Sequence, residues 1–242
     1  MIDIKNMSVQ YDQDVLALKN INLSFDRGCY VIIGKNGSGK STLLQTIVGI
    51  VDKAGEINID GFAVEEKNLI EIRKKVGFVF QNPDHQLFMS RIYDDIAFGL
   101  VNQKLPQNEI EQRVQAIAKQ LHLESLLNRS CHKLSGGQKR LAAIASVLVM
   151  DPDIILMDEP SSFLDPESRR KIIQLIQSLS KTLIIVTHDL DMALDIADYV
   201  ILLNEGNVVS QGKPEDILTN KELLEANGLE LPYCYQRWIW WI

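Results

Sequence analysis

The chain has 242 residues, 46% of them hydrophobic and 24% charged, so it is long enough to bury a core without disulfide bonds or metal staples. This composition excludes disorder, collagen and a coiled coil as the main architecture. With 25 basic and 32 acidic side chains the net charge is −7, which argues against a nucleic-acid partner, because phosphate neutralisation needs a basic face. An acidic chain can still hold a local phosphate site made of backbone N–H groups.

The cysteines and the apolar segments give no sign of export or membrane insertion. Cys29, Cys131 and Cys234 show no zinc or disulfide spacing, which fits a reducing cytosol. The first residues lack the basic region and apolar core of a signal peptide. The longest apolar stretch, residues 141–150, is far shorter than the ~20 residues that cross a bilayer. We therefore expect a chain that does not cross a membrane by itself, which leaves docking onto a membrane protein open.

The first third of the chain has the pattern of strands followed by a loop and a helix. Residues 2–11 and 21–25 alternate as half-buried strands do. The run 29–33 is apolar throughout, which is typical of a strand covered on both faces. It leads into a glycine-rich loop, and residues 42–50 then have the pattern of a helix with a buried face. Two further strands are expected at residues 56–60 and 76–80.

From about residue 83 to 150 the pattern is helical. Ile110, Val114, Ile117 and Leu121 recur at spacings of 4, 3 and 4, which places them on one face of a helix. After residue 151 strands and helices alternate again, with strands expected at 154–157, 183–186, 199–203 and 207–210 and a helix at 166–180.

This alternation predicts an α/β fold with a mostly parallel sheet and an antiparallel β portion at the N-terminus. We expect one domain over residues 1–242, with a core at about 1–82 and 151–215 and an inserted helical subdomain at about 83–150. A short C-terminal extension is expected at about 216–242. Trp238, Trp240 and Trp241 lie in its last five residues, and we expect them to be buried, because exposed they would form an apolar patch. The chain's own core, a partner subunit and an unnatural end remain the alternatives.

A phosphate-binding loop lies between the apolar strand 29–33 and the helix that follows. Residues 34–41 match the complete P-loop pattern of glycine, four residues, glycine, lysine and serine. The glycines let N–H groups point at a phosphate, Lys40 supplies a cation for the β- and γ-phosphates, and Ser41 is suited to Mg²⁺. The alternative, a chance glycine-rich turn, is disfavoured by the strand and helix on either side. The residues assigned to ATP here are Gly34, Lys35, Asn36, Gly37, Ser38, Gly39, Lys40, Ser41 and Thr42.

Two adjacent acids follow the apolar run 154–157. Asp158 and Glu159 should project from the carboxyl edge of the sheet, where ligands bind in such folds. With a P-loop upstream, one acid can help to bind Mg²⁺ while the other polarises the attacking water. The alternative is a solvated acidic pair at a strand end.

Residues 134–138, Leu-Ser-Gly-Gly-Gln, form a second candidate anion site. Ser135 can cap a helix that we expect from about 138 to 150, and the glycines expose N–H groups at its start. The chain has one P-loop and no obvious second phosphate of its own, so the simplest source of a phosphate here is another copy. The alternative is a plain N-cap.

Together these motifs resemble the nucleotide-binding subunits of ATP-binding-cassette (ABC) transporters. The resemblance covers residues 1 to about 215 and adds Gln81 and His188, which each follow a strand, and Asp165 at the end of 161–165. It implies a P-loop NTPase core of the ABC ATPase type, ATP as substrate with Mg²⁺, and a second ATPase subunit that makes a homodimer or a heterodimer.

The resemblance also implies a role for each matching residue. Tyr11 would stack on adenine, and Gln81 would contact Mg²⁺ or the attacking water. Glu159 would be the general base, and His188 would reach the γ-phosphate. Asp165 would lie at the dimer interface. The implied sets are Glu159, His188, Gln81 and Lys40 for catalysis, Ser41, Gln81 and Asp158 for the metal, and Ser135, Gly137 and Gln138 for the nucleotide of the opposite subunit. Tyr11 as an ordinary edge residue and His188 as a helix-start residue remain the alternatives.

Residues 80–88 and 94–100 carry a narrower resemblance to the ATPases of energy-coupling factor transporters, which import vitamins or cobalt and nickel ions in prokaryotes. In that group an acidic groove near this loop receives basic helices of a membrane-embedded subunit. Asp84, Asp94 and Asp95 are candidate contributors, with a solvated acidic face as the alternative. The resemblance implies a peripheral protein on the cytoplasmic face of the membrane. Phe163 departs from the family, which usually has a small residue there.

Two other functions are compatible with this fold. One is a soluble ABC-type ATPase that is not coupled to transport, although DNA-repair forms carry a long coiled-coil insertion and ribosomal forms carry two cassettes. The other is a regulatory cassette without catalysis, which would usually lack Lys40, Glu159 or His188, and all three are present.

Overall fold

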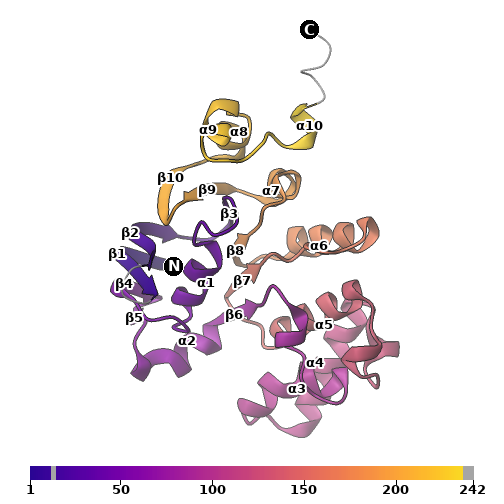
Figure 1. Ribbon diagram of the computed structural model, residues 1–242. Coiled ribbons are helices and arrows are strands. Elements are labelled where there is room, and N and C mark those ends of the chain that lie inside the picture. Colours follow the sequence, from indigo (N-terminus) through magenta and orange to yellow (C-terminus); the bar gives the residue numbers. More distant parts are fainter. Residues whose placement is uncertain (12–14, 237–242) are drawn as a thin grey trace.

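Figure 1 shows the computed structural model, which describes residues 1–11 and 15–236 as two β-sheets surrounded by helices. The antiparallel sheet follows the order β2 (Val15–Phe25), β1 (Ile2–Tyr11), β4 (Ala54–Ile59) and β5 (Phe62–Ala63). The larger sheet follows the order β10 (Asn207–Gly212), β9 (Tyr199–Asn204), β3 (Cys29–Ile33), β8 (Thr182–Val186), β7 (Ile154–Asp158) and β6 (Val76–Val79). Its pairs are parallel except for β9–β10, so the predicted α/β class with a mostly parallel sheet is confirmed.

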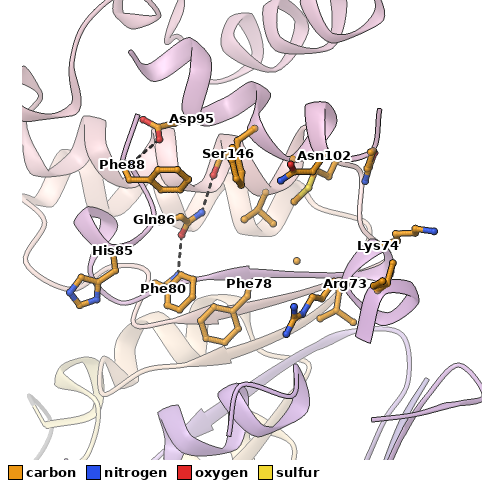
Figure 2. A pocket seen from close by; sticks show the side chains of 18 residues that line it. Arg73, Lys74, Phe78, Phe80, His85, Gln86, Phe88, Asp95, Asn102 and Ser146 are labelled. Atoms are coloured by element: carbon orange, nitrogen blue, oxygen red, sulfur yellow. Dashed lines mark hydrogen bonds between the residues drawn. The ribbon is translucent and has the colours of Figure 1, made fainter. Parts of the chain in front are cut away.

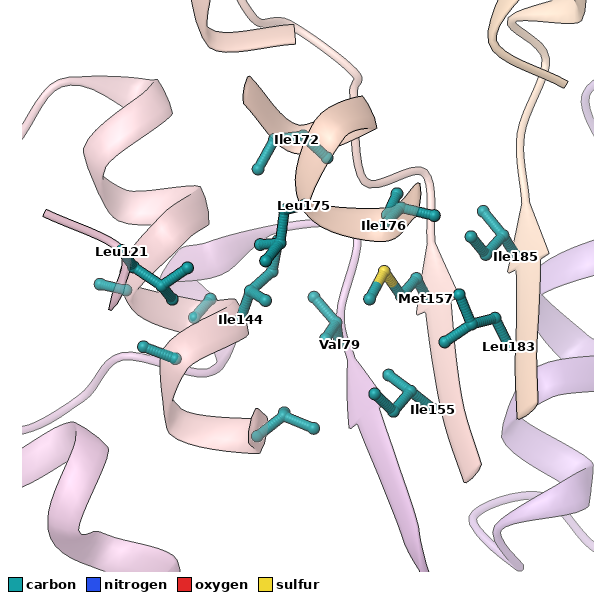
Figure 3. Close-up of a cluster of buried hydrophobic side chains, with 14 of the residues drawn as sticks. Val79, Leu121, Ile144, Ile155, Met157, Ile172, Leu175, Ile176, Leu183 and Ile185 are labelled. Carbon is teal, nitrogen blue, oxygen red and sulfur yellow. The ribbon is translucent and has the colours of Figure 1, made fainter. Parts of the chain in front are cut away.

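Alternate residues of the central strands enter two different hydrophobic clusters. In β7, Ile155 and Met157 pack with α5 (Gly136–Leu148) and α6 (Pro166–Ser178), as Figure 3 shows. Ile154 and Leu156 pack instead with α1 (Lys40–Ile47) and the antiparallel sheet. Because both faces are covered, these strands consist of continuous apolar runs without polar alternation.

Three helices stand between β6 and β7 in the chain: α3 (Ile92–Asn102), α4 (Gln107–Gln120) and α5. Ile110, Val114 and Ile117 of α4 are buried, as their spacing predicts, and so is Leu121 at its C-cap. Figure 1 shows this group of helices beyond the end of β6, on the far side of the molecule from β1 and β2.

Three of the elements that differ from the sequence-based expectation lie in the first third of the chain. The helix expected from residue 42 begins at Lys40, so the lysine and serine of the P-loop belong to its first turn. The strand expected at 21–25 begins at Val15, because register shifts against β1 break the regular alternation of its first half. The helix α2 (Leu69–Lys75) was not expected; it has seven residues, of which Ile72 is the one fully buried, so it carries little periodic signal.

The C-terminal part follows β10 as short helices that pack beside the larger sheet. The chain continues after α7 (Leu190–Ile196) and the last strands into α8 (Pro214–Leu218), α9 (Lys221–Ala226) and α10 (Tyr233–Gln236). The three tryptophans of the expected extension lie outside the described residues. None of the described helices has the length and apolarity that crossing a bilayer requires.

Candidate functional site

The P-loop takes its shape from glycines in left-handed backbone conformations. Gly39 has φ of 101°, and a Cβ there would lie 2.7 Å from the Leu18 side chain and 2.8 Å from the Ala17 carbonyl oxygen. Gly37 also has positive φ, at 79°, but a Cβ at this position would meet no other described atom within 4 Å, so that side of the loop is open. The loop is therefore packed against β2 on one side and accessible to a phosphate on the other.

Lys40 turns back over the loop that precedes it. Its Nζ donates to the carbonyl oxygens of Gly34 at 2.7 Å and Lys35 at 3.0 Å, and the residue is 6% exposed. Burial lowers the pKa of this lysine, while the nearby Glu159 and Asp158 carboxylates partly oppose the shift. An ammonium has three donors, so one N–H beyond these two bonds can reach a phosphate oxygen.

Ser41 and Asp158 meet at the carboxyl edge of the sheet. The Ser41 hydroxyl donates to Asp158 Oδ1 at 3.1 Å. Burial raises the pKa of Asp158, and the hydrogen bond from Ser41 opposes that shift. A hydroxyl and a carboxylate are hard oxygen ligands that suit Mg²⁺. Within residues 1–11 and 15–236 no group of three or more His, Cys, Asp or Glu side chains could hold a metal. Mg²⁺ commonly binds through one or two protein oxygens together with substrate phosphates and water.

Glu159 and His188 come from neighbouring parallel strands and face each other. The Glu159 Oε2 atom lies 2.8 Å from His188 Nδ1 and accepts from the Ser162 hydroxyl at 3.0 Å and from the Thr187 hydroxyl at 3.4 Å. Glu159 is 5% exposed, whereas the His188 side chain is 59% exposed. The fold thus brings the two predicted catalytic residues together. Ser162 and Thr187 were missed from the sequence, where they look like ordinary loop and strand-end residues.

Tyr11 and Gln81 lie at the periphery of this site. The Tyr11 hydroxyl donates to Thr42 Oγ1 at 3.4 Å, and the residue is 40% exposed, so the predicted adenine-stacking ring stands beside the first turn of α1. Gln81 is exposed and follows β6, the strand next to β7.

Residues 134–138 form the start of α5. Ser135 and Gln138 make a reciprocal capping box, in which Ser135 Oγ accepts from Gln138 N–H and Gln138 Oε1 accepts from Ser135 N–H. Ser135 and Gly136 are exposed. Gly137 is buried against α6, where a Cβ would clash with the Ser168 hydroxyl. The cap is therefore formed as predicted, while the Gln138 side chain is engaged within it.

The fold does not bring this second anion site to the P-loop of the same chain. The helix α5 packs in the cluster on one face of the larger sheet, and α1 packs in the cluster on the other face. Figure 1 shows the two helices well separated. Within one chain, the start of α5 and the P-loop therefore lie in different parts of the fold.

The loop between Glu159 and α6 presents an unpacked aromatic ring. Phe163 is 96% exposed and has φ of 61°, a left-handed conformation that is uncommon for a bulky residue. Asp165 is engaged, because its carboxylate caps α6 by accepting from the N–H groups of Glu167 and Ser168 and from the Ser168 hydroxyl. Asp165 is therefore fixed by its capping bonds, whereas the ring of Phe163, two residues earlier, is exposed to solvent.

A groove of about 510 Å³ runs between β6, α2, α3 and α5, and Figure 2 shows its lining. Aromatic rings and one methionine form its apolar part: Phe78, Phe80, Phe88, Phe98 and Met150. Phe88 is 61% exposed and meets Phe98 edge-to-face at 5.1 Å. Arg73 and Lys74 of α2 also line the groove. An exposed apolar groove of this kind is typical of a docking surface for another protein.

Of the three acids predicted for this surface, Asp95 is buried, which contradicts the prediction for that residue, while Asp94 and Asp84 are partly exposed and each paired with a basic side chain. Asp95 is 4% exposed and accepts from the backbone N–H groups of Phe88 and Met89 at 2.9 Å each, so it ties a loop to α3. Asp94 makes a bidentate pair with Arg91, and Asp84 pairs with Lys139 at 2.6 Å. Asp94 thus has a local partner three residues earlier in the chain, Asp95 is held by the preceding loop, and Asp84 is paired with a residue of α5 that is distant in sequence.

Comparison with known proteins places the chain among ATP-binding cassettes. The sequence profile described as "ABC transporter" matches residues 18–162. The energy-coupling factor transporter ATP-binding protein EcfA of Carboxydothermus hydrogenoformans is 46% identical over 236 residues, which cover 96% of this chain and 87% of that protein. EcfA1 of Ligilactobacillus salivarius is 44% identical over 97% of this chain and 85% of its own.

Two solved structures are similar over most of the chain. The cbiO1 protein of Clostridium perfringens, part of the ABC transporter complex cbiONQ, has a TM-score of 0.83 and 37% identity over 98% of both chains. A dimeric ATP-binding cassette in a post-hydrolysis state with ADP and Pi has a TM-score of 0.81 and 32% identity over 88% of this chain and 99% of its own.

The role of Asp95 in the fold can be tested by unfolding. Asp95→Ala should lower the free energy of unfolding by about 2 kcal/mol, because two backbone N–H groups lose their acceptor. Asp95→Asn keeps an oxygen acceptor and should cost less than ~1 kcal/mol. Asp94→Asn is the control and should cost at most ~1 kcal/mol, since it removes a surface ion pair. Denaturant titrations of the isolated subunit measure all three, and a larger loss for Asp94→Asn than for Asp95→Ala would contradict this role.

Proposed function

The chain belongs to the ABC transporter family, and we propose that its site hydrolyses ATP as one half of a pair and thereby powers import through a membrane-embedded partner. The protein is an ATPase, and ATP is its substrate. The observation that carries the proposal is the division of the nucleotide elements. The P-loop, Asp158 and Glu159 lie at one end of the sheet, while Ser135 and Gly136 face outward on a different part of the chain.

The chemistry we propose starts with the phosphates of ATP in the P-loop, where backbone N–H groups and Lys40 bind them. Ser41, Asp158 and Gln81 would hold Mg²⁺, which when bound neutralises charge on the β- and γ-phosphates. Glu159 accepts a proton from the attacking water. His188, which contacts Glu159, orients that carboxylate and reaches the γ-phosphate from its exposed position.

A second cassette completes the site in this proposal. Ser135 and Gly136 at the start of α5 are exposed, so this helix N-terminus is available to the phosphate held by the other subunit. Gly137 and Gln138 support that surface, the first by packing on α6 and the second through the capping box. Two opposed sites then close when ATP is bound and separate after hydrolysis.

The importer we propose is of the energy-coupling factor type, as in the relatives that carry this name. The cargo class is a vitamin or a transition-metal ion, and the chain would work as a peripheral subunit on the cytoplasmic face of the prokaryotic membrane. The apolar groove beside α3 is the proposed seat for the membrane partner. Apolar rings rather than free carboxylates would supply most of the contact, because Asp94 and Asp95 are engaged within the chain.

Glu159→Gln tests the chemical step. The amide keeps the size of the side chain but cannot take a proton, so turnover should fall by about 10²–10⁴-fold. ATP affinity should change little, because Glu159 is not assigned to the phosphates, and ATP-bound pairs should accumulate. Phosphate release and the mass of the ATP-bound protein measure the two effects. Glu167→Gln, an exposed acid on α6, is the matched control. Turnover of Glu159→Gln within about threefold of wild type would remove Glu159 from this role.

Phe88→Glu tests coupling to a membrane partner. A carboxylate in the apolar groove should abolish copurification with membrane proteins from detergent-solubilised membranes, because the partner would have to bury an unpaired charge. Basal ATP hydrolysis by the isolated subunit should be unchanged. Val209→Glu, at an exposed apolar residue of β10, controls for the added charge. Retention of the partner by Phe88→Glu would contradict the docking site and favour a soluble ABC-type ATPase.

A further inference from the structure

The loop that carries Gln81 is attached to α5 by side chains. Its strand, β6, is the edge strand of the larger sheet, and the chain leaves it after Val79. The Phe80 N–H then donates to Gln86 Oε1 at 3.2 Å. Gln86 Nε2 donates in turn to the Ala143 carbonyl at 2.7 Å and to Ser146 Oγ at 2.9 Å, as Figure 2 shows for Ser146. One side of the loop is therefore tied to the middle of α5.

Arg140 ties the other side of the same loop to the first half of α5. Its Nη1 donates to the Phe80 carbonyl at 2.8 Å, and its Nη2 donates to the Gln81 carbonyl at 2.6 Å. The residue is 2% exposed, and its Nε has no hydrogen-bond partner within the described part of the chain. Burial lowers the pKa of this arginine, and the nearby Asp158 and Glu159 oppose the shift.

Burying the guanidinium of Arg140 costs free energy of folding, which suggests that this side chain has a functional role. Taking a charge out of water carries a large penalty. The hydrogen bonds of Arg140 go to neutral carbonyl groups, and the nearby Asp158 and Glu159 carboxylates offset only part of the penalty because neither is hydrogen-bonded to it. Its planar fork supplies a separate nitrogen for each of the two successive carbonyl oxygens and holds them in a fixed geometry, whereas a lysine would have to serve both from one nitrogen. Those carbonyls belong to Gln81 and to the residue before it, so the fork determines where the Gln81 side chain begins.

We propose that Arg140 is a positioning residue for ATP hydrolysis: it holds the backbone at Gln81 so that this side chain stays beside Asp158 and Glu159, and it makes the loop move with α5. The inference rests on the place given to Gln81 in the proposed function. Ser135 caps the same helix five residues earlier in the chain, so any shift of the loop is passed to the surface that faces the nucleotide of the second subunit. A single buried side chain thus connects the two sites of a pair.

Three substitutions of Arg140 distinguish the contribution of its two-nitrogen hydrogen-bonding geometry from that of its positive charge. Arg140→Met keeps much of the volume without donors, and kcat should fall about ten- to hundredfold, the effect expected when a group that acts on the reacting atoms is displaced by a fraction of an ångström to about 1 Å. KM for ATP should change by less than about threefold, because the P-loop is untouched. Arg140→Lys keeps the charge and Arg140→Gln keeps a donor, and both should lie between Arg140→Met and wild type. Arg113→Met, at an exposed arginine of α4, is the matched control and should be neutral.

A double-mutant cycle with Gln81→Ala decides whether Arg140 acts through Gln81. If it does, Gln81→Ala with Arg140→Met should have the kcat of Gln81→Ala alone within about threefold, because the residue to be positioned is gone. If Arg140 acted only on the stability of the fold, the fold-reductions in kcat of the two single variants would multiply in the double variant. That result would overturn the proposal. So would a kcat for Arg140→Met within threefold of wild type at equal folded fraction by circular dichroism. Arg140→Lys enters the same cycle if Arg140→Met does not fold.

The same measurements distinguish failure of this inference from failure of the proposed function. If Gln81→Ala alone leaves kcat unchanged, the place of Gln81 in the ATP site is wrong. If Gln81→Ala lowers kcat but Arg140→Met does not, the site stands and only the role of Arg140 falls.

Discussion

Lys40, Asp158 and Glu159 are charged side chains that the fold takes out of water at one edge of its parallel sheet, at 6%, 4% and 5% exposure. Buried charges are tolerated where opposite charges and hydrogen bonds compensate for lost water. The P-loop carbonyls do this for Lys40, Ser41 does it for Asp158, and Ser162, Thr187 and His188 do it for Glu159. This arrangement requires the carboxyl ends of β3, β8 and β7 to lie side by side. The three strands contain continuous apolar runs, and burial of both of their faces stabilises them in that position.

The larger sheet separates the hydrophobic core into two clusters, one on each face. Helix α1 fills one face of the larger sheet together with the antiparallel sheet, and α5 and α6 fill the other. The charged edge and the capped start of α5 are therefore kept apart in one chain, although both have the N–H groups of an anion site. Such a division is useful when two copies or relatives face each other, because neither can complete a site alone.

Much of the site could be predicted from sequence because its elements are local. The P-loop between an apolar strand and a helix, the acids at a strand end and the capping box at Ser135 each lie within a few residues, and the structure has all three. The roles of Asp95 and Arg140 could not be predicted, because their partners are backbone groups supplied by tertiary contact. The full length of β2 was missed because its register shifts hide the period of two.

The central claim is that a working ATP site needs two cassette subunits. The most direct measurement is the mass, by native mass spectrometry, of the ATPase-active complex extracted from membranes and held with a non-hydrolysable ATP analogue. We expect two cassette subunits in each complex, either two copies of this chain or one copy with a relative, and two bound nucleotides. A complex that contains a single cassette subunit and hydrolyses ATP at the full rate would contradict the account.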